Sequence, residues 1–285
     1  MKYSILAVDL DGTLLNKEHE IDLETIEAIH EFRAKGGKVV ICSGRTALST
    51  RWIAETIGLT DPIIAYNGAV IQSNNGDIIE KFLFNKDVIS AFLDFCQSFG
   101  VYAHFYEGDT ILIPEKNRWN DSWVEKNILP LARSGGKQNV CQTYRDQCGV
   151  KLVTDLNQHI EVNKPEIMKI AVFHEQDSLY EFAKKLEDQT EDYEISTSLD
   201  YANLEISPFG VSKAQSLAIV ASHLHVPLSK VAAIGDNYND YKMLKTAGLG
   251  IAMGNAPEKV KGAADVITDT NQQAGVAKAI KKYLL

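Results

Sequence analysis

Short apolar runs alternate with amphipathic segments in the first third of the chain. The runs Ile5–Val8, Val39–Cys42 and Pro62–Tyr66 are separated by stretches with helical spacing at Ile21–Lys35 and Thr46–Ile57. A continuous apolar run indicates a strand that is buried on both faces, because a half-exposed strand alternates apolar and polar residues. Such strands, separated by helices, are typical of a parallel sheet with helices on both sides.

The last third of the chain repeats this pattern. We predict helices at Ser212–Leu224, Asp240–Thr246 and Val276–Tyr283, and strands at Val231–Ile234, Leu249–Ala252 and Val266–Ile267. The two ends of the chain therefore form one parallel-sheet domain of the α/β class.

The middle of the chain favours antiparallel pairs instead. Val101–Tyr106 and Thr110–Ile113 flank Glu107-Gly108-Asp109, which is a hairpin signal. The same region contains further predicted elements, which are a strand at Met168–Phe173, a helix at Ser178–Gln189 and a strand pair at Glu194–Ser198 and Ala202–Ile206. We therefore expect residues 84–208 to form an inserted α+β domain, and residues 1–83 and 209–285 to form a Rossmann-like core, with hinges at the two crossings.

Composition narrows the class of protein. The chain has 285 residues, of which 45% are hydrophobic and 24% charged, as in ordinary globular proteins. The net charge of −9 argues against nucleic acid as a bulk electrostatic partner, but a local pocket can still bind a small phosphorylated molecule. No apolar run is long enough to span a membrane and no signal-peptide pattern opens the chain, so we expect a cytoplasmic protein without a membrane partner.

The four cysteines show no zinc-binding spacing. Cys42 lies in an apolar run, which predicts a buried thiol. Cys141 and Cys148 are close enough in sequence to pair, although reduced thiols fit a cytoplasmic protein better.

Two aspartates follow the first apolar run directly. Asp9 and Asp11 stand two residues apart where the strand ends, and Gly12 then turns the chain. Two like charges this close repel each other, so the pair favours a bound cation. Ligands of open parallel sheets bind at the carboxyl ends of the strands. Three further segments fall at the same edge of the predicted sheet: Ser43-Gly44-Arg45, Gly235–Asp240 and the helix start at Lys213.

These residue types together suit phosphoryl transfer. Asp9, Asp11 and Asp236 offer the hard oxygen ligands that magnesium prefers. A metal-bound carboxylate can attack a phosphate and form an acyl-phosphate, while a second carboxylate donates a proton to the leaving oxygen. Ser43 and Lys213 are suited to hold the remaining phosphoryl oxygens.

The chain resembles the haloacid dehalogenase superfamily, in its Cof-type phosphatase branch with a large inserted cap. The residues that carry the resemblance occur in order along the chain: Asp9-Leu10-Asp11-Gly12-Thr13, Ile41-Cys42-Ser43-Gly44-Arg45, Gly210-Val211-Ser212-Lys213 and Gly235-Asp236-Asn237-Tyr238-Asn239-Asp240, with Tyr66-Asn67-Gly68-Ala69 and Ala252-Met253-Gly254-Asn255-Ala256 in addition. The resemblance implies a Rossmann-like core and a cap that closes over the site. Alanine at 214 replaces a common glycine, which leaves the chemistry intact.

The resemblance also implies residue roles. Asp9 is the nucleophile and a Mg²⁺ ligand, Asp11 is the general acid/base and binds the metal through its backbone carbonyl, and Asp236 is the third protein ligand. Asp240 and Thr13 are supporting residues, with Asp240 orienting ligands or Lys213. Phosphate contacts are expected from Ser43, Lys213 and the backbone amides of Leu10 and Gly44, and Asn239 either contacts the phosphate or supports the metal site.

Three further residues are candidates for substrate contact. Arg45 either contacts substrate or pairs with a nearby acid, and Asn67 either contacts substrate or stabilises its own Asn-Gly turn. Lys169 opens a predicted strand of the inserted domain and is a candidate anion contact. Trp119 and Trp123 have helical spacing, which favours a structural role.

The resulting hypothesis is a magnesium-dependent phosphatase acting on a small phosphorylated metabolite, such as a sugar phosphate. A phosphomutase or phosphotransferase uses the same groups but passes the phosphoryl group to a sugar hydroxyl. A phospho-aspartate signalling switch also places aspartates at strand ends, but such receiver-like domains lack a large insertion. Neither the substrate nor the oligomeric state follows from the residues.

Overall fold

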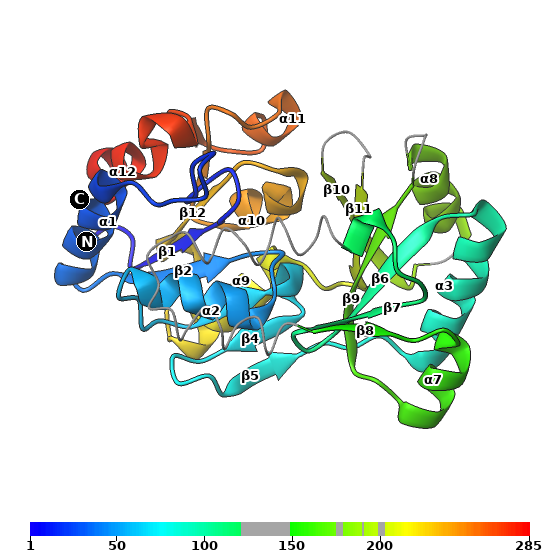
Figure 1. Cartoon of the computed structure of the whole chain (residues 1–285). Coiled ribbons are helices and arrows are strands. Elements are labelled where there is room, and N and C mark those ends of the chain that lie inside the picture. Colours follow the sequence, from blue (N-terminus) through cyan, green and yellow to red (C-terminus); the bar gives the residue numbers. More distant parts are fainter. Residues whose placement is uncertain (121–148, 175–178, 190, 199–202) are drawn as a thin grey trace. The chain divides into compact units, whose positions relative to one another are not determined.

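The computed structural model describes residues 1–120, 149–174, 179–189, 191–198 and 203–285 (Figure 1). The chain divides into two compact units, one formed by Met1–Glu80 with Ser212–Leu285 and the other by Lys81–Val211. The second unit is therefore an insertion in the first. The sequence pattern predicts the two crossings at 83/84 and 208/209, and in the structure they lie at 80/81 and 211/212.

The first unit contains a sheet with strand order β14-β13-β12-β1-β2-β3-β4-β5. The strands from β14 to β3 are parallel, and β4 is antiparallel to β3. Their bounds are Ile5–Val8 (β1), Lys38–Cys42 (β2), Ile63–Ala65 (β3), Val70–Gln72 (β4), Ile78–Lys81 (β5), Val231–Gly235 (β12), Leu249–Ala252 (β13) and Val266–Ile267 (β14). The predicted parallel sheet is confirmed, whereas β4 and β5 were not predicted.

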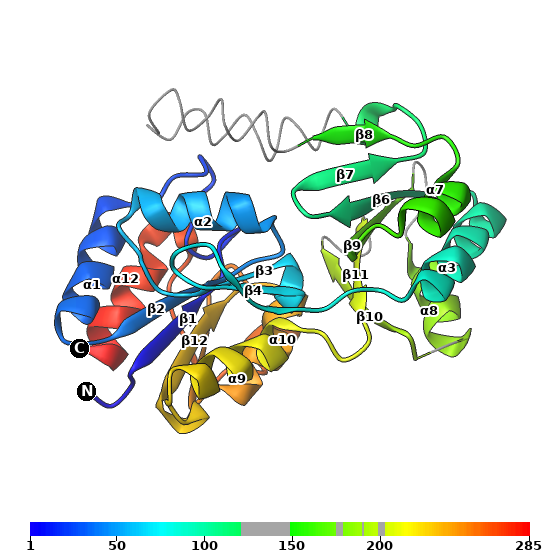
Figure 2. The same cartoon turned by 90° about the horizontal axis from the view of Figure 1, so that it is seen from below.

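Helices cover both faces of this sheet, with α1 and α12 on one side and α9 and α10 on the other (Figure 2). Their bounds are Leu23–Ala34 (α1), Ala47–Thr56 (α2), Lys213–His223 (α9), Tyr241–Thr246 (α10), Glu258–Lys261 (α11) and Gly275–Ala279 (α12), with a π-helical turn at Ile280–Leu284 and short 3₁₀ turns at Tyr66–Gly68, Leu228–Lys230, Tyr238–Asp240 and Asn271–Gln273. Side-chain caps begin α2 and α9. Thr46 accepts the Ser49 N–H at the start of α2, and Ser212 accepts the Gln215 N–H at the start of α9.

The inserted unit contains a sheet with strand order β10-β11-β9-β6-β7-β8, in which β7 and β8 are parallel and the other pairs antiparallel. The predicted hairpin is confirmed, since Glu107 of β6 pairs with Thr110 of β7. The bounds are Lys86–Phe99 (α3), Tyr102–Glu107 (β6), Thr110–Ile113 (β7), Val150–Leu152 (β8), Leu156–Asn163 (α7), Ile167–Phe173 (β9), Tyr180–Gln189 (α8), Tyr193–Ser198 (β10) and Asn203–Pro208 (β11).

The apolar core of the inserted unit lies between its helices and one face of its sheet. Phe92 of α3 and Phe182 of α8 belong to the same buried cluster as Phe105, Ile170 and Leu204 of the sheet. Because successive strand residues point to opposite faces, the neighbouring polar positions of these strands lie on the other face. This arrangement confirms the inserted α+β fold.

Other sequence predictions have mixed outcomes. Cys42 and Cys96 are buried and unpaired, while Trp123, Cys141 and Cys148 lie outside the described residues. Trp119 is half-buried and stacks on Phe173, with ring centroids 5.0 Å apart, which fits its predicted structural role. Within the described part of the chain, no helix combines the length and apolar character that a membrane span requires.

Candidate active site

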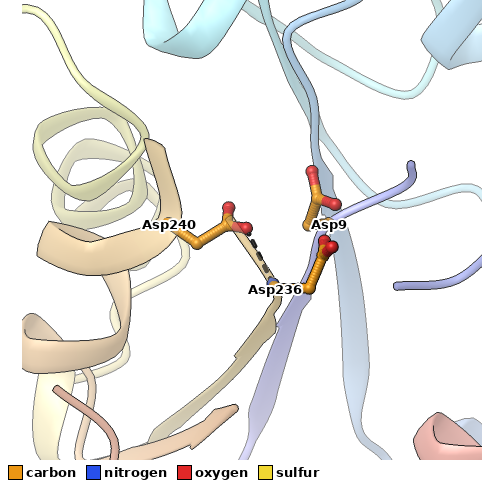
Figure 3. A group of neighbouring side chains, drawn as sticks. All are labelled: Asp9, Asp236 and Asp240. Carbon is orange, nitrogen blue, oxygen red and sulfur yellow. Dashed lines mark hydrogen bonds between the residues drawn. The ribbon is translucent and has the colours of Figure 1, made fainter. Parts of the chain in front are cut away.

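Four segments of the first unit meet at the carboxyl edge of its parallel sheet. The strand β1 lies between β12 and β2, so the order of the strands reverses there, which is where open α/β sheets bind ligands. Asp9 follows β1, while Asp236 and Asp240 follow β12 (Figure 3). One carboxylate oxygen from each of the three lies within 4.8 Å of the others. The fold therefore brings Asp9 close to two carboxylates that lie more than 220 residues later in the chain.

Lys213, the first residue of α9, is completely buried between two of these carboxylates. Its Nζ donates to Asp9 Oδ1 at 2.6 Å and to Asp240 Oδ1 at 2.7 Å. Burial alone lowers the pKa of Lys213, but the charges of Asp240 and Asp9 outweigh it and hold the pKa above its ordinary value. Lys213 therefore stays charged. The helix dipole disfavours a cation at the start of a helix, and the two carboxylates compensate for this.

Asp240 holds both Lys213 and the loop that contains Asp236. Its Oδ1 accepts a hydrogen bond from the Lys213 ammonium, and its Oδ2 accepts the backbone N–H groups of Asp236 and Asn237, both at 3.0 Å. Figure 3 shows the bond to the Asp236 N–H. A Cβ at Gly235 would lie 2.5 Å from the Asp240 side chain, so only glycine fits that position. Both oxygens of Asp240 are therefore committed to orienting Lys213 and the Asp236 loop.

Asp236 is held by the loops on either side. Thr13 Oγ1 donates to its Oδ1 at 2.9 Å, and Asn255 Nδ2 donates to its Oδ2 at 3.2 Å. Gly12 has a φ of +84°, and a Cβ there would lie 2.3 Å from Asp236 Oδ2. The Asp9–Thr13 loop thus approaches the Asp236 carboxylate so closely that only glycine fits at position 12.

Asp11 points to a different partner. Arg45 Nε and Nη2 donate to its two carboxylate oxygens at 2.7 and 2.6 Å. Desolvation raises the pKa of Asp11, but the Arg45 guanidinium outweighs it and holds the pKa below its ordinary value. Of the two roles expected for Arg45, the structure shows the ion pair with a nearby acid. The Asp11 side chain remains half-exposed.

The other core candidates form a second group around the β2 and β3 loops. Ser43 is buried, its Oγ accepts the Arg45 N–H at 3.1 Å, and its carbonyl accepts the Asn67 N–H at 3.0 Å. Asn67 adopts a left-handed conformation with a φ of 55°, and its Oδ1 accepts Asn239 Nδ2 at 3.0 Å. Ser43, Asn67 and Asn239 are therefore neighbours, as expected for one site.

Three sequence candidates are placed by their elements. Leu10 is buried directly after Asp9, and Gly44 stands between Ser43 and Arg45. Lys169 belongs to the inserted unit, where it is buried, pairs with Glu205 and lies 5.3 Å from the centre of the Tyr106 ring.

The electrostatics of the cluster fit a divalent cation. Desolvation and then the charge of Asp240 raise the pKa of Asp236 to about 7 and that of Asp9 well above its ordinary value. Among the described residues at this edge, four carboxylates meet two cationic groups, those of Lys213 and Arg45, so negative charge is in excess. A divalent cation would balance this charge, and carboxylate oxygens are the ligands that magnesium prefers.

One participating residue, Asn255, had no role assigned to it from sequence. It follows β13 at the same sheet edge and donates to both Asp236 and the Gly12 carbonyl. The rule that located the other segments, a polar residue directly beyond a buried parallel strand, also points to Asn255.

Comparison with known proteins agrees with this geometry. Residues 6–280 match a family model described as haloacid dehalogenase-like hydrolase. Phosphatase YwpJ of Bacillus subtilis is 32% identical over 287 residues, which cover 98% of this chain and 99% of that protein. The 5-amino-6-(5-phospho-D-ribitylamino)uracil phosphatase YcsE of the same organism is 32% identical over 281 residues, which cover 99% and 96%.

A solved structure shares the whole fold. It is a haloacid dehalogenase-like hydrolase from B. subtilis, with a TM-score of 0.83 and 30% identity, and the match covers 99% of this chain and 100% of that one. The chain belongs to the haloacid dehalogenase-like hydrolases, as a Cof-type phosphatase with an inserted cap.

Proposed function

We propose that this chain is a magnesium-dependent phosphatase that hydrolyses a small phosphorylated metabolite through an aspartyl-phosphate on Asp9. The observation that carries the proposal is the buried Asp9–Lys213–Asp240 triad beside Asp236. It fixes one carboxylate next to a cation at the ligand-binding edge of the sheet. Such preorganised charge is what phosphoryl transfer requires, because its transition state needs positioning and charge neutralisation more than covalent chemistry.

The first half-reaction forms a bond between an Asp9 oxygen and phosphorus. The bond between phosphorus and the alcohol oxygen breaks, and Asp11 gives that oxygen its proton. Ser43, Lys213, Asn239 and the backbone amides of Leu10 and Gly44 hold the other phosphoryl oxygens. Asp9, Asp236 and the backbone carbonyl of Asp11 would hold Mg²⁺, which would supply the positive charge that lets a carboxylate approach a phosphate dianion.

The second half-reaction regenerates the enzyme. Asp11 takes a proton from water, the water oxygen attacks phosphorus, and the bond to Asp9 breaks. Inorganic phosphate then leaves. Arg45 binds Asp11 through both carboxylate oxygens and lowers its pKa, so the ion pair must open and Asp11 must take up a proton before it can protonate the leaving oxygen.

For the substrate class we propose small phosphate esters of sugars or polyols. The relative that acts on a 5-phospho-D-ribitylamino compound supports this choice. We assign substrate selection to the inserted unit, where Lys169 is the residue to test, and Asn67 of the first unit is a second candidate for substrate contact. We also propose a cytoplasmic location, where metabolites of this kind are found. The pairing of Lys169 with Glu205 keeps a buried charge in the inserted unit.

The test is a screen of phosphorylated metabolites with Mg²⁺, with and without a chelator. We expect phosphate release that requires the metal and disappears in Asp9→Asn. The matched control is Asp77→Asn, the same change at an exposed aspartate of the loop between β4 and β5, which should keep full turnover. Absence of turnover by the wild-type protein across the panel, or full turnover by Asp9→Asn, would contradict the proposal.

A further inference from the structure

We propose that Asn255 is a positioning residue that sets the metal affinity of the site by fixing the orientation of Asp236. The inference rests on the proposed function, since it assumes that Asp236 is a ligand of the metal. It concerns the loop that follows β13, a part of the chain to which the phosphoryl-transfer steps above assign no role.

The orientation of the Asn255 amide is determined by its neighbours. Its Oδ1 accepts the backbone N–H of Asn271 at 3.1 Å, so its Nδ2 must face the other way. There the two hydrogens of the amide have two acceptors, the Gly12 carbonyl at 2.9 Å and Asp236 Oδ2 at 3.2 Å. One side chain therefore ties together the loops after β1, β12 and β13.

This contact completes a clamp on the Asp236 carboxylate. Thr13 holds Oδ1 and Asn255 holds Oδ2, so rotation of the carboxylate plane would break both hydrogen bonds. The lone pairs that remain on the two oxygens are then directed in a fixed way. Hydrogen bonds of this kind to a ligating carboxylate raise metal affinity, because the site loses no rotational freedom when the ion binds.

The loop that carries Asn255 is itself anchored. Gly254 N–H donates to the Asp269 carbonyl at 3.1 Å, and Asn271 Nδ2 donates to the Leu15 carbonyl at 2.9 Å. The second bond returns to the segment that follows Gly12. The clamp therefore has a rigid base, and its strength depends on the amide of Asn255.

A neutral donor suits this position on electrostatic grounds. A lysine at 255 would satisfy Asp236 but would also repel the metal ion, and an alanine would leave Asp236 Oδ2 without this donor. The amide satisfies the oxygen and leaves its negative charge in place for the metal. Because Asn255 is exposed, its replacement removes these contacts without opening a cavity in the core.

The experiment is calorimetric titration of Mg²⁺ into wild type, Asn255→Ala and Asn255→Ser, with melting temperatures of the metal-free proteins measured in parallel. The matched control is Asn75→Ala, an exposed asparagine of the β4–β5 loop whose side-chain contacts are local. We expect a Kd for Mg²⁺ about tenfold to a hundredfold higher in both Asn255 variants and unchanged in the control. At saturating Mg²⁺, KM for the phosphorylated substrate should stay within about twofold of wild type.

Two failures are distinguishable. If wild type binds Mg²⁺ and both Asn255 variants bind it equally well, the clamp is refuted while the proposed function stands. If wild type itself binds no Mg²⁺, the proposed function fails first. If the melting temperature falls in Asn255→Ala but not in Asn255→Ser, the Kd of the serine variant decides, because the serine side chain is also too short to reach Asp236.

Discussion

Replacing Lys213 by methionine tests the buried charge triad most severely. The change keeps most of the side-chain volume but removes the ammonium that lies 2.6 Å from Asp9 and 2.7 Å from Asp240. Two carboxylates then remain in a space without solvent, since Lys213 and Asp240 are both fully buried. We expect a large loss of stability in the metal-free protein.

The size of this loss follows from the geometry. Each ammonium–carboxylate pair at roughly 4 Å between charge centres is worth about 4 kcal/mol at an effective dielectric constant near 20, and desolvation offsets much of the sum. Removing one partner of a buried pair typically costs 3–5 kcal/mol, because the remaining charge is uncompensated. That is a large part of the roughly 5–15 kcal/mol of total stability of a typical protein.

The loss should depend on pH with a definite sign. Lys213 lowers the pKa of Asp9, so its removal raises that pKa further above the unfolded value. A carboxyl group whose folded pKa lies above its unfolded pKa destabilises the fold at high pH, and this penalty disappears as the pH falls toward the unfolded pKa. The deficit of Lys213→Met relative to wild type should therefore shrink between about pH 7 and pH 5.

The assay is urea unfolding followed by circular dichroism at both pH values. The matched control is Lys261→Met, since Lys261 also contacts a carboxylate, Glu258 at 3.0 Å, but in an exposed pair worth about 0–1 kcal/mol. The double variant Lys213→Met, Asp240→Asn should recover part of the lost stability, because it removes the buried Asp240 charge together with the Lys213 charge that compensated it. A deficit for Lys213→Met as small as that for Lys261→Met would refute the reasoning.

Three further predictions concern His104, Gly12 and Cys42. Burial lowers the pKa of His104 to about 3, so the unfolded chain binds a proton that the folded one does not, and the contribution of this histidine to the unfolding free energy should fall by about 3–5 kcal/mol as the pH drops from 6.5 to 3. Urea titrations should show this contribution as the difference in pH dependence between wild type and His104→Leu. Gly12→Ala should destabilise by about 1–3 kcal/mol and weaken Mg²⁺ binding in calorimetry, because its Cβ would meet Asp236, whereas Gly76→Ala, with a similar φ and open space, should change stability alone. Burial also raises the pKa of the Cys42 thiol, so peptide mapping after iodoacetamide treatment should find it modified only in unfolded protein.

Elements buried on both faces could be predicted from sequence almost to the residue. The strand at Ile5–Val8 has the predicted bounds, since all four residues are fully buried and nothing but apolar side chains fits. The elements that were not predicted are short or exposed. Ile78 in β5 and both Val150 and Leu152 in β8 face solvent, so the periodicity of these strands is weak.

The candidate site was predictable as a set of segments but not as a network of contacts. Strand ends and residue types identify Asp9, Lys213 and Asp236, because the carboxyl ends of parallel strands share one edge of the sheet. Pairings such as Arg45 with Asp11 depend on side-chain geometry between loops, and spacing in the chain says nothing about them. The contact between Asn255 and Asp236 is of the same kind.

The most direct measurement of the central claim is to trap the phosphoryl group on the protein. Wild-type protein turning over a radioactively labelled phosphate ester with Mg²⁺ is quenched in acid, digested, and mapped by mass spectrometry. We predict label on the peptide that contains Asp9, lost when unlabelled substrate is added before the quench, and no label in Asp9→Asn. Rapid turnover of the substrate with no label on Asp9 would contradict the account.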